Sequence, residues 1–260
     1  GKALQSGTSH DLGQNFAKAY DIKFVDADRA IKHAYTTSWG VSWRMLGGLI
    51  MTHGDDRGLR IPPKMAPIEA VLIPIVRSND DRATEACRQL AERLTDAGFR
   101  VRADLRDAQP GWKYSEWDIR GVPVRIEIGP RDVDAGTAVL ARRDRSKGDA
   151  DQRRSVALAE IPVVLRDLLE DIQGSLYREA KAFLDKQTIA TTNRDEFLEL
   201  CRTRAGMIDI AWCERPECEA AVKTATTATT RVLHELDDPK ATCTACGEPA
   251  KARAYFAQSY

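Results

Sequence analysis

Four cysteines near the C-terminal end of this chain constrain its fold more than any other feature. Cys213 and Cys218 are separated by four residues, and Cys243 and Cys246 by two. Two short-spaced pairs far apart in sequence are typical of a closed tetrahedral zinc site, whose four thiolates leave no position for water. Disulfides are the alternative, but thiols stay reduced in a cytosolic protein. The spacing therefore predicts a structural zinc ion that stabilises folding and takes no part in catalysis.

Apolar patterns divide the chain into blocks. Pro62, Pro63 and Pro67 stop regular structure and predict a domain boundary. After them, residues 69–76 form a continuous apolar run, as in a strand buried on both faces. Strands and helices then alternate, which predicts an open mixed sheet flanked by helices. The elements expected beyond the boundary are strands at 69–76, 99–105, 122–128, 138–141 and 207–212, and helices at 78–98, 114–120, 161–186 and 196–201.

Composition and the first residues narrow the class of protein. Basic and acidic residues balance at 39 each, so no net charge attracts nucleic acid, and any RNA contact must come from local clusters such as Arg142, Arg143 and Arg145. An ordinary solvated surface is the alternative. No apolar run approaches the ~18 residues that span a bilayer, and the N-terminus lacks a signal-peptide core, so we expect a cytoplasmic protein. Because the chain opens without methionine, we expect a C-terminal portion of a longer protein.

Residues 37–67 place an arginine at the start of an apolar helix, directly after a Ser-Trp-Gly turn. Four residues recur with helical spacing and predict one buried face of this helix: Met45, Leu46, Leu49 and Ile50. Arg44 then lies in the first turn, where a positive charge meets the unfavourable end of the helix dipole. This misfit favours a functional role over an ordinary surface position. We infer a place that holds a nucleotide triphosphate.

The same segment resembles motif 3 of a class II aminoacyl-tRNA synthetase, and its surroundings resemble prolyl-tRNA synthetases of the archaeal and eukaryotic type. Residues 4–18 (LQSGTSHDLGQNFAK) resemble the strand and helix that line the proline pocket in that family, and residues 226–231 (TTATTR) match a further family sequence. With the four cysteines and the final Tyr260, the resemblance covers essentially all 260 residues in the family's order.

The resemblance implies a multidomain protein of α+β and α/β type. Residues 1–66 would be the C-terminal part of the antiparallel-sheet catalytic domain, residues 67–160 an α/β anticodon-binding domain with a mixed sheet, and residues 161–260 an α+β zinc-binding domain. The implied activity is that of a proline-tRNA ligase. The proline carboxylate attacks the α-phosphate of ATP, aided by Mg²⁺, and the prolyl group then passes from the adenylate to tRNA(Pro). Such catalysis depends on positioning and charge neutralisation.

The resemblance also implies contacts with both small substrates. Arg44, the residue it assigns to catalysis, would hold the ATP phosphates through its guanidinium fork. Gln5 and Ser42 would bind ATP beside it. The residues that would line the proline pocket are Thr8, His10, Ser38 and Gly40.

Four charged residues match the positions with which the family reads the anticodon guanines: Asp118, Arg125, Arg131 and Lys147. Arginine and lysine can donate to guanine O6 and N7, and a carboxylate can accept from N1 and N2. Asp118 stands where the family more usually has a longer acidic side chain, which shortens its reach. Nearby aromatic residues, Trp112 and Trp117 among them, either stack on splayed bases or pack beneath a helix.

The resemblance leaves the implied active site incomplete. The chain contains no counterpart of the motif 1 elements that dimerise the enzyme, of the motif 2 arginine that grips the α-phosphate, or of the loop that holds the imino nitrogen of proline. We therefore expect the chain alone to be inactive, and we expect a homodimer of the full-length enzyme. A non-catalytic tRNA-binding module or a truncated paralogue is the alternative.

Overall fold

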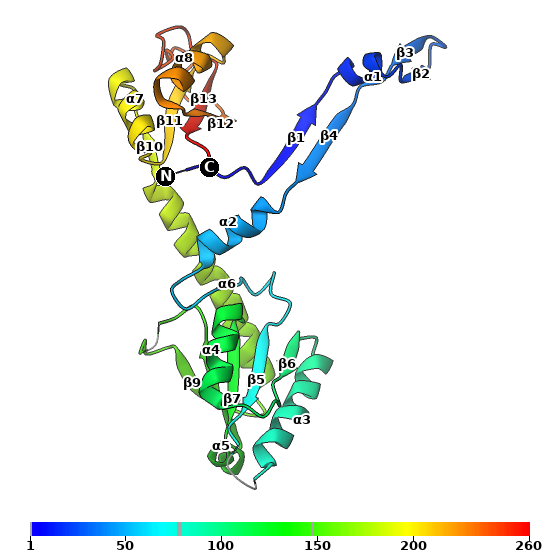
Figure 1. Ribbon diagram of the computed structural model, residues 1–260, viewed down its shortest axis with the longest axis vertical. Helices are drawn as coiled ribbons and strands as arrows, with labels where there is room; N and C mark the ends of the chain where they lie inside the picture. The colour runs from blue at the N-terminus through cyan, green and yellow to red at the C-terminus, as the bar shows by residue number, and fades with distance from the viewer. Residues whose placement is uncertain (1, 77–79, 147) are drawn as a thin grey trace. The chain divides into compact units, whose positions relative to one another are not determined.

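The computed structural model describes residues 2–76, 80–146 and 148–260. The chain divides into two compact units, one of Gly1–Gly48 with Phe183–Tyr260 and one of Leu49–Ala182. Both units combine helices and β-strands, which agrees with the predicted mixed α/β class (Figure 1). Among the described residues, no helix is both long enough and apolar enough to cross a bilayer.

A five-stranded mixed sheet forms the centre of the unit Leu49–Ala182. Its order is β6-β5-β7-β8-β9, in which β6, β5 and β7 run parallel and β8 and β9 are antiparallel to their neighbours. The strands are β5 (Ala70–Pro74), β6 (Val101–Ala103), β7 (Val124–Ile128), β8 (Thr137–Arg142) and β9 (Arg153–Ala157). This sheet confirms the predicted open mixed sheet, and β9 adds to the strands predicted for it.

Helices cover both faces of this sheet. They are α3 (Arg82–Asp96), α4 (Pro110–Arg120), α5 (Pro130–Ala135) and α6 (Ile161–Lys186). Successive residues of a strand point to opposite faces. Ala70 and Leu72 of β5 therefore pack in one core with α3 and α6, while Val71 and Ile73 pack with Trp117 of α4. The continuous apolar run at β5 is thus explained by burial on both sides. Residues 78 and 79 of the predicted helix at 78–98 lie outside the described residues.

A four-stranded sheet organises residues 183–260. Its order is β10-β11-β13-β12, with β10 and β11 parallel and the other pairs antiparallel. The elements are β10 (Thr188–Ala190), α7 (Arg194–Thr203), β11 (Met207–Trp212), α8 (Pro216–Thr226), β12 (Thr229–His234) and β13 (Ala252–Ala257). Phe256 packs edge-on against Phe197 and Trp212, with ring centroids 5.3 and 4.9 Å apart. These contacts fix α7 and the end of β11 in one core.

The N-terminal residues form short elements with little buried surface. They are β1 (Gly7–Asp11), α1 (Asn15–Ala19), β2 (Lys23–Val25), β3 (Ile31–His33), β4 (Thr37–Val41) and α2 (Arg44–His53). Antiparallel pairing joins β1 to β4 and β2 to β3. The prediction of a buried face on α2 is wrong, because none of its residues is buried and Leu46 and Ile50 are half exposed. The face is apolar as predicted, but the described residues do not cover it.

Candidate functional site

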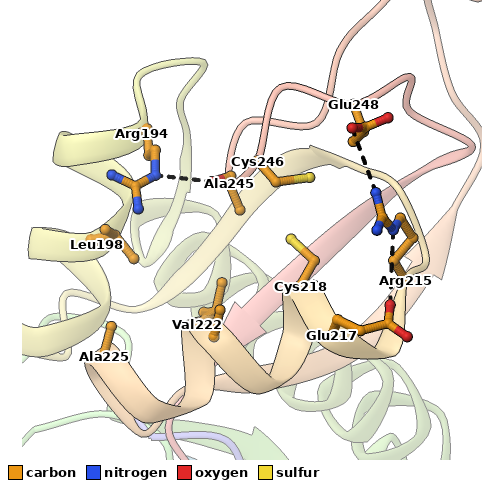
Figure 2. A pocket seen from close by; sticks show the side chains of 11 residues that line it. Arg194, Leu198, Arg215, Glu217, Cys218, Val222, Ala225, Ala245, Cys246 and Glu248 are labelled. Carbon is orange, nitrogen blue, oxygen red and sulfur yellow. Dashed lines mark hydrogen bonds and ion pairs between the residues drawn. The ribbon is translucent and has the colours of Figure 1, made fainter.

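A pocket of about 460 Å³ lies between α7, α8 and the turn that carries Cys246 (Figure 2). Leucine, valine and alanine side chains line it together with two arginines. Arg215 lies 3.8 Å from the carboxylate of Glu217 and 3.6 Å from that of Glu248, and Arg194 donates to a backbone carbonyl at 2.9 Å. Because the two arginines are matched by two glutamates in the lining, the pocket has no net charge with which to select an ionic ligand. The sequence patterns did not indicate this pocket.

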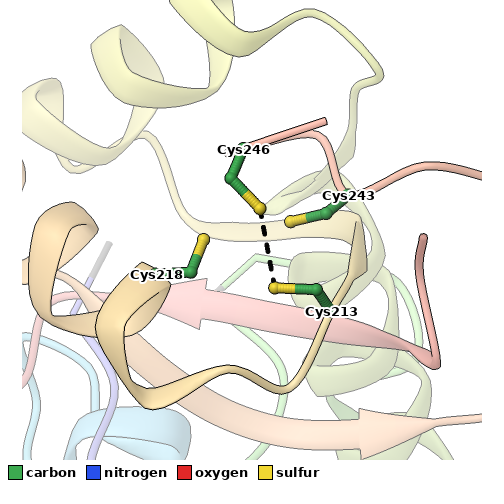
Figure 3. Close-up of side chains that lie close together, drawn as sticks. All are labelled: Cys213, Cys218, Cys243 and Cys246. Carbon is green, nitrogen blue, oxygen red and sulfur yellow. Dashed lines mark hydrogen bonds between the residues drawn. The ribbon is translucent and has the colours of Figure 1, made fainter. Parts of the chain in front are cut away.

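Beside this pocket, the four cysteines of the predicted metal site come together. Their sulfur atoms all lie within 4.8 Å of one another, and the sulfurs of Cys213 and Cys246 are 3.7 Å apart (Figure 3). Sulfurs bound tetrahedrally to zinc at about 2.3 Å would be about 3.8 Å apart, whereas a disulfide requires about 2.05 Å. All four residues are free thiols. The donor set and its spacing therefore fit a metal ion and do not fit paired disulfides.

Short local structures bring the two cysteine pairs to this point. Cys213 directly follows β11, and Cys218 lies in the first turn of α8. Cys243 and Cys246 lie on a tight turn in which Gly247 donates its N–H to the Cys243 carbonyl at 2.8 Å. The φ of Gly247 is 79°, a conformation that glycine adopts without strain. Burial raises the pKa of Cys243 to about 11, so a bound cation would be needed to favour its thiolate.

Two of the predicted anticodon residues form an ion pair in the other unit. Arg125 on β7 donates from Nη1 to Oδ1 of Asp118 at 2.9 Å and from Nε to Oε1 of the buried Glu127 at 2.9 Å. Its guanidinium carbon also lies 4.2 Å from the ring centroid of Tyr114. Arg125 and Asp118 thus present a donor and an acceptor side by side, which is the combination that a guanine edge requires.

The remaining predicted anticodon residues are not joined to this pair. Arg131 is exposed on α5, and among the described residues it forms no ion pair with Asp118. Lys147 lies outside the described residues. Trp117 of α4 is buried against Val71 and Ile73 of β5, whereas Trp112 is exposed on the same helix. Of the two tryptophans, Trp112 is therefore the one accessible to a base.

A second network holds Asp118 from another side, and the sequence patterns did not indicate it. Arg143 donates to the two carboxylate oxygens of Asp55 at 2.7 and 2.6 Å, and from Nε to the backbone carbonyl of Asp118 at 3.0 Å. Arg57 Nη1 lies 3.8 Å from Oδ2 of Asp118. Hydrogen bonding to Arg143 lowers the pKa of Asp55 to about 2, so this carboxylate is charged at neutral pH.

The four predicted proline-pocket residues lie together on the β1–β4 pair. Thr8 lies opposite Gly40, and His10 lies opposite Ser38. Residues two apart on a strand share a face with their cross-strand partners, so all four occupy one face. A Cβ on Gly40 would lie 3.3 Å from Oγ1 of Thr8, which limits bulk at this position. The strand pairing therefore brings these four residues together, and their contact with proline stays a prediction.

The three predicted ATP contacts flank the same strands. Arg44 is the first residue of α2, as predicted, and Gln5 and Ser42 lie just outside β1 and β4. All three are exposed. Among the described residues, no hydrogen bond or ion pair joins Arg44 to Thr8 or His10. The structure thus places Arg44 at a helix start without joining it to the proline residues.

Comparisons with known proteins agree with these features. Residues 69–168 match a model described as "Anticodon binding domain", and residues 194–260 match one described as "Prolyl-tRNA synthetase, C-terminal". The curated proline-tRNA ligases of Symbiobacterium thermophilum, Alkaliphilus oremlandii and Natranaerobius thermophilus are 44%, 43% and 42% identical to this chain. Each alignment covers 100% of this chain and 53 or 54% of the relative. The chain therefore spans about half the length of the curated relatives it matches.

The two matched models cover the parts of the fold that carry the candidate sites. The first includes β5 to β9 with the Asp118 and Arg125 pair, and the second includes the four cysteines. The resemblance inferred from short sequence motifs is confirmed by these matches along the chain. The matched models and the curated relatives together support the conclusion that this chain is similar to a C-terminal portion of a prolyl-tRNA synthetase.

Proposed function

We propose that this chain is the part of a proline-tRNA ligase that reads the anticodon of tRNA(Pro) and contributes one edge of the active site. The whole protein would activate proline with ATP and transfer it to tRNA(Pro). The observation that carries this proposal is the alignment of the whole chain with half of each ligase at 42 to 44% identity. We assign residues 1–66 to the catalytic domain, 67–160 to the anticodon-binding domain and 161–260 to the zinc-binding domain.

Anticodon reading would depend on the pair of Asp118 and Arg125. The carboxylate would accept from N1–H and the 2-amino group of a guanine, and the guanidinium would donate to O6 or N7. Each well-placed contact of this kind is worth about 1–3 kcal/mol of discrimination. The two side chains are partly exposed, at 25% and 12%, so a base could reach them without unfolding the helix. Arg131 and Lys147 are proposed as further donors.

In the active site, Arg44 would neutralise the charge that develops on the phosphates of ATP, and Mg²⁺ would accompany ATP as part of the substrate. Gln5 and Ser42 would bind ATP beside it. The shared face of β1 and β4 would hold proline, with the remaining contacts supplied by a longer chain. The proposed proline contacts are Thr8, His10, Ser38 and Gly40.

The four cysteines are proposed to hold a structural zinc ion. A closed set of four thiolates leaves no open position for a substrate, and it would join β11 and α8 to the turn of Cys243 and Cys246. The homodimer of the full-length enzyme and the cytoplasmic location both stay predictions from the sequence.

Proline-dependent exchange of pyrophosphate into ATP tests the catalytic part of the proposal. We expect exchange by a version extended at its N-terminus through motif 2, and none by this chain alone. In the extended version, Arg44→Ala should lower the rate about 10²-fold, as loss of a transition-state charge contact does, whereas the control Arg29→Ala should not. Exchange by the short chain would contradict the half-site assignment. An extended version that binds tRNA(Pro) without exchange would be a non-catalytic tRNA-binding module.

A further inference from the structure

The backbone around Asp118 is fixed by the segment that follows α2. Leu59 donates its N–H to the carbonyl of Ile119 at 3.0 Å, and Ile61 donates to the carbonyl of Gly121 at 3.1 Å. A Cβ on Gly121 would lie 2.5 Å from Cβ of Leu59, a distance that real atoms do not tolerate. The end of α4 and this segment are therefore packed backbone to backbone. Residues of the segment can then influence the carboxylate of Asp118.

Within this segment, Arg57 lies between two carboxylates. Its Nη1 is 3.8 Å from Oδ2 of Asp118, and its Nε is 4.0 Å from Oδ2 of Asp55. Its Nη2 donates to the backbone carbonyls of Arg143 and Arg145 at 2.9 Å each. Asp55 also accepts the two short hydrogen bonds from Arg143. Asp55 thus attracts two guanidinium groups that both lie within reach of Asp118.

The consequence is a difference between the two oxygens of Asp118. Its Oδ1 accepts a hydrogen bond from Arg125, whereas Oδ2 has Arg57 at a longer distance and accepts no hydrogen bond from the described residues. The Coulomb attraction between two charges falls as their separation grows, and it is stronger where water is partly excluded. Removal of the Asp55 charge would therefore let Arg57 close onto Oδ2.

We propose that Asp55 is a positioning residue for anticodon reading. By attracting Arg57, its carboxylate keeps one oxygen of Asp118 available to the N1–H and 2-amino group of a guanine. This inference rests on the proposed function, because it assumes that Asp118 meets a guanine of the tRNA. It adds a residue of the linker after α2 to the determinants of anticodon specificity.

Binding of RNA hairpins that carry the proline anticodon loop tests the proposal on this chain. One hairpin has guanine at the anticodon positions, and the others replace each guanine by inosine, which lacks the 2-amino group. We expect the native chain to prefer guanine about tenfold at one position, Asp55→Asn to reduce this ratio to about twofold, and Asp55→Asn with Arg57→Gln to restore it. The matched control is Asp80→Asn, which removes another two-pronged pair, with Arg82, at 3.0 and 2.9 Å. It should leave the ratio unchanged.

Two outcomes in the variants that carry Asp55→Asn would overturn the proposal. The first is an unchanged ratio of guanine to inosine binding in Asp55→Asn. The second is a ratio that stays low in the double variant, because this result would mark a merely structural role for Asp55. Arg57→Gln alone gives an answer that does not depend on whether Asp55→Asn folds. It should keep the native ratio, and a loss of discrimination would also overturn the proposal. If the native chain itself does not distinguish inosine, the proposed contact at Asp118 fails first, which separates the two claims.

Discussion

β5 and β4 both contain large apolar residues, yet one strand is buried and the other is exposed. All of Ala70–Pro74 is buried, whereas all of Thr37–Val41 is exposed, including Trp39 and Val41. β5 lies inside a five-stranded sheet with helices on both faces, while β4 belongs to a two-stranded sheet. A two-stranded pair is marginally stable in water. The anticodon-binding sheet therefore has a core of its own, whereas the N-terminal elements present apolar surface that they do not cover.

The largest expected effect concerns residues 183–260, which carry the four cysteines. It tests whether the core of this region is independent of the core of the anticodon-binding sheet. Cys218→Ser should remove one of the four proposed zinc ligands and so weaken metal binding, which in a complete structural site is worth on the order of 10 kcal/mol. Amide hydrogen exchange should then show lost protection in β11 and α8 and retained protection in β5 and β7.

Elemental analysis supplies the control for this prediction. The native chain and Cys87→Ser, which alters a buried thiol of the other core, should each retain one zinc ion per chain. A native chain without metal, with its four thiols oxidised in pairs, would contradict the zinc assignment.

A matched pair of leucines tests the comparison itself. Leu72→Ala, in the buried strand, should lower the free energy of unfolding by about 2–5 kcal/mol because it leaves a cavity. Leu46→Ala, on the exposed face of α2, should change it by no more than about 0.5 kcal/mol. Urea unfolding followed by circular dichroism measures both values. Similar losses in the two variants would show that the N-terminal elements have a core of their own.

A matched pair of arginines tests whether the same two regions also differ in RNA binding. Arg125→Ala should weaken binding of tRNA(Pro) to this chain by about 1–3 kcal/mol, because it removes the proposed guanine contact. Arg44→Ala should leave this affinity within about twofold, because its proposed partner is ATP. Filter binding at fixed salt concentration measures both. A larger loss for Arg44→Ala would assign RNA binding to the N-terminal elements instead.

The smallest expected effect is a pH dependence inside the anticodon-binding unit. Hydrogen bonding to Arg143 lowers the pKa of Asp55 from 3.8 to about 2. A carboxylate with a lowered pKa contributes stability that is complete above its unfolded value and is lost as the pH falls through its folded value. Because Asp55 is partly exposed, we expect about 1 kcal/mol. Between about pH 5 and about pH 2, the native chain should therefore lose more stability than Asp55→Asn, and equal losses would argue against this ion pair.

Sequence patterns predicted the regions that have a buried core better than they predicted the exposed N-terminal elements. The bounds of α6 and β11 agree with prediction because the spacing of their apolar residues matches the residues that are buried in the core. β13 was missed, although Ala252, Ala254 and Phe256 are buried at alternate positions and give a period-two signal. The buried face expected on α2 was wrong because a pattern shows that a face is apolar but not what covers it.

Some parts of the candidate sites could be predicted from the sequence and others could not. The cysteine cluster was predictable because ligand spacing is a local property of each pair. The ion pair of Asp55 and Arg143 joins residues 88 apart, so no local pattern could indicate it. The assignment of Asp118 came from family resemblance alone, whereas that of Arg44 came first from its position at the start of an apolar helix and then from the resemblance.

The proposal that this chain reads the proline anticodon is tested most directly by its affinity for tRNA(Pro) with the native anticodon and with both guanines replaced by adenines. Each lost base contact is worth about 1–3 kcal/mol, so we expect at least about tenfold weaker binding of the substituted tRNA at the same salt concentration. Equal affinity for the two tRNAs would contradict the proposal.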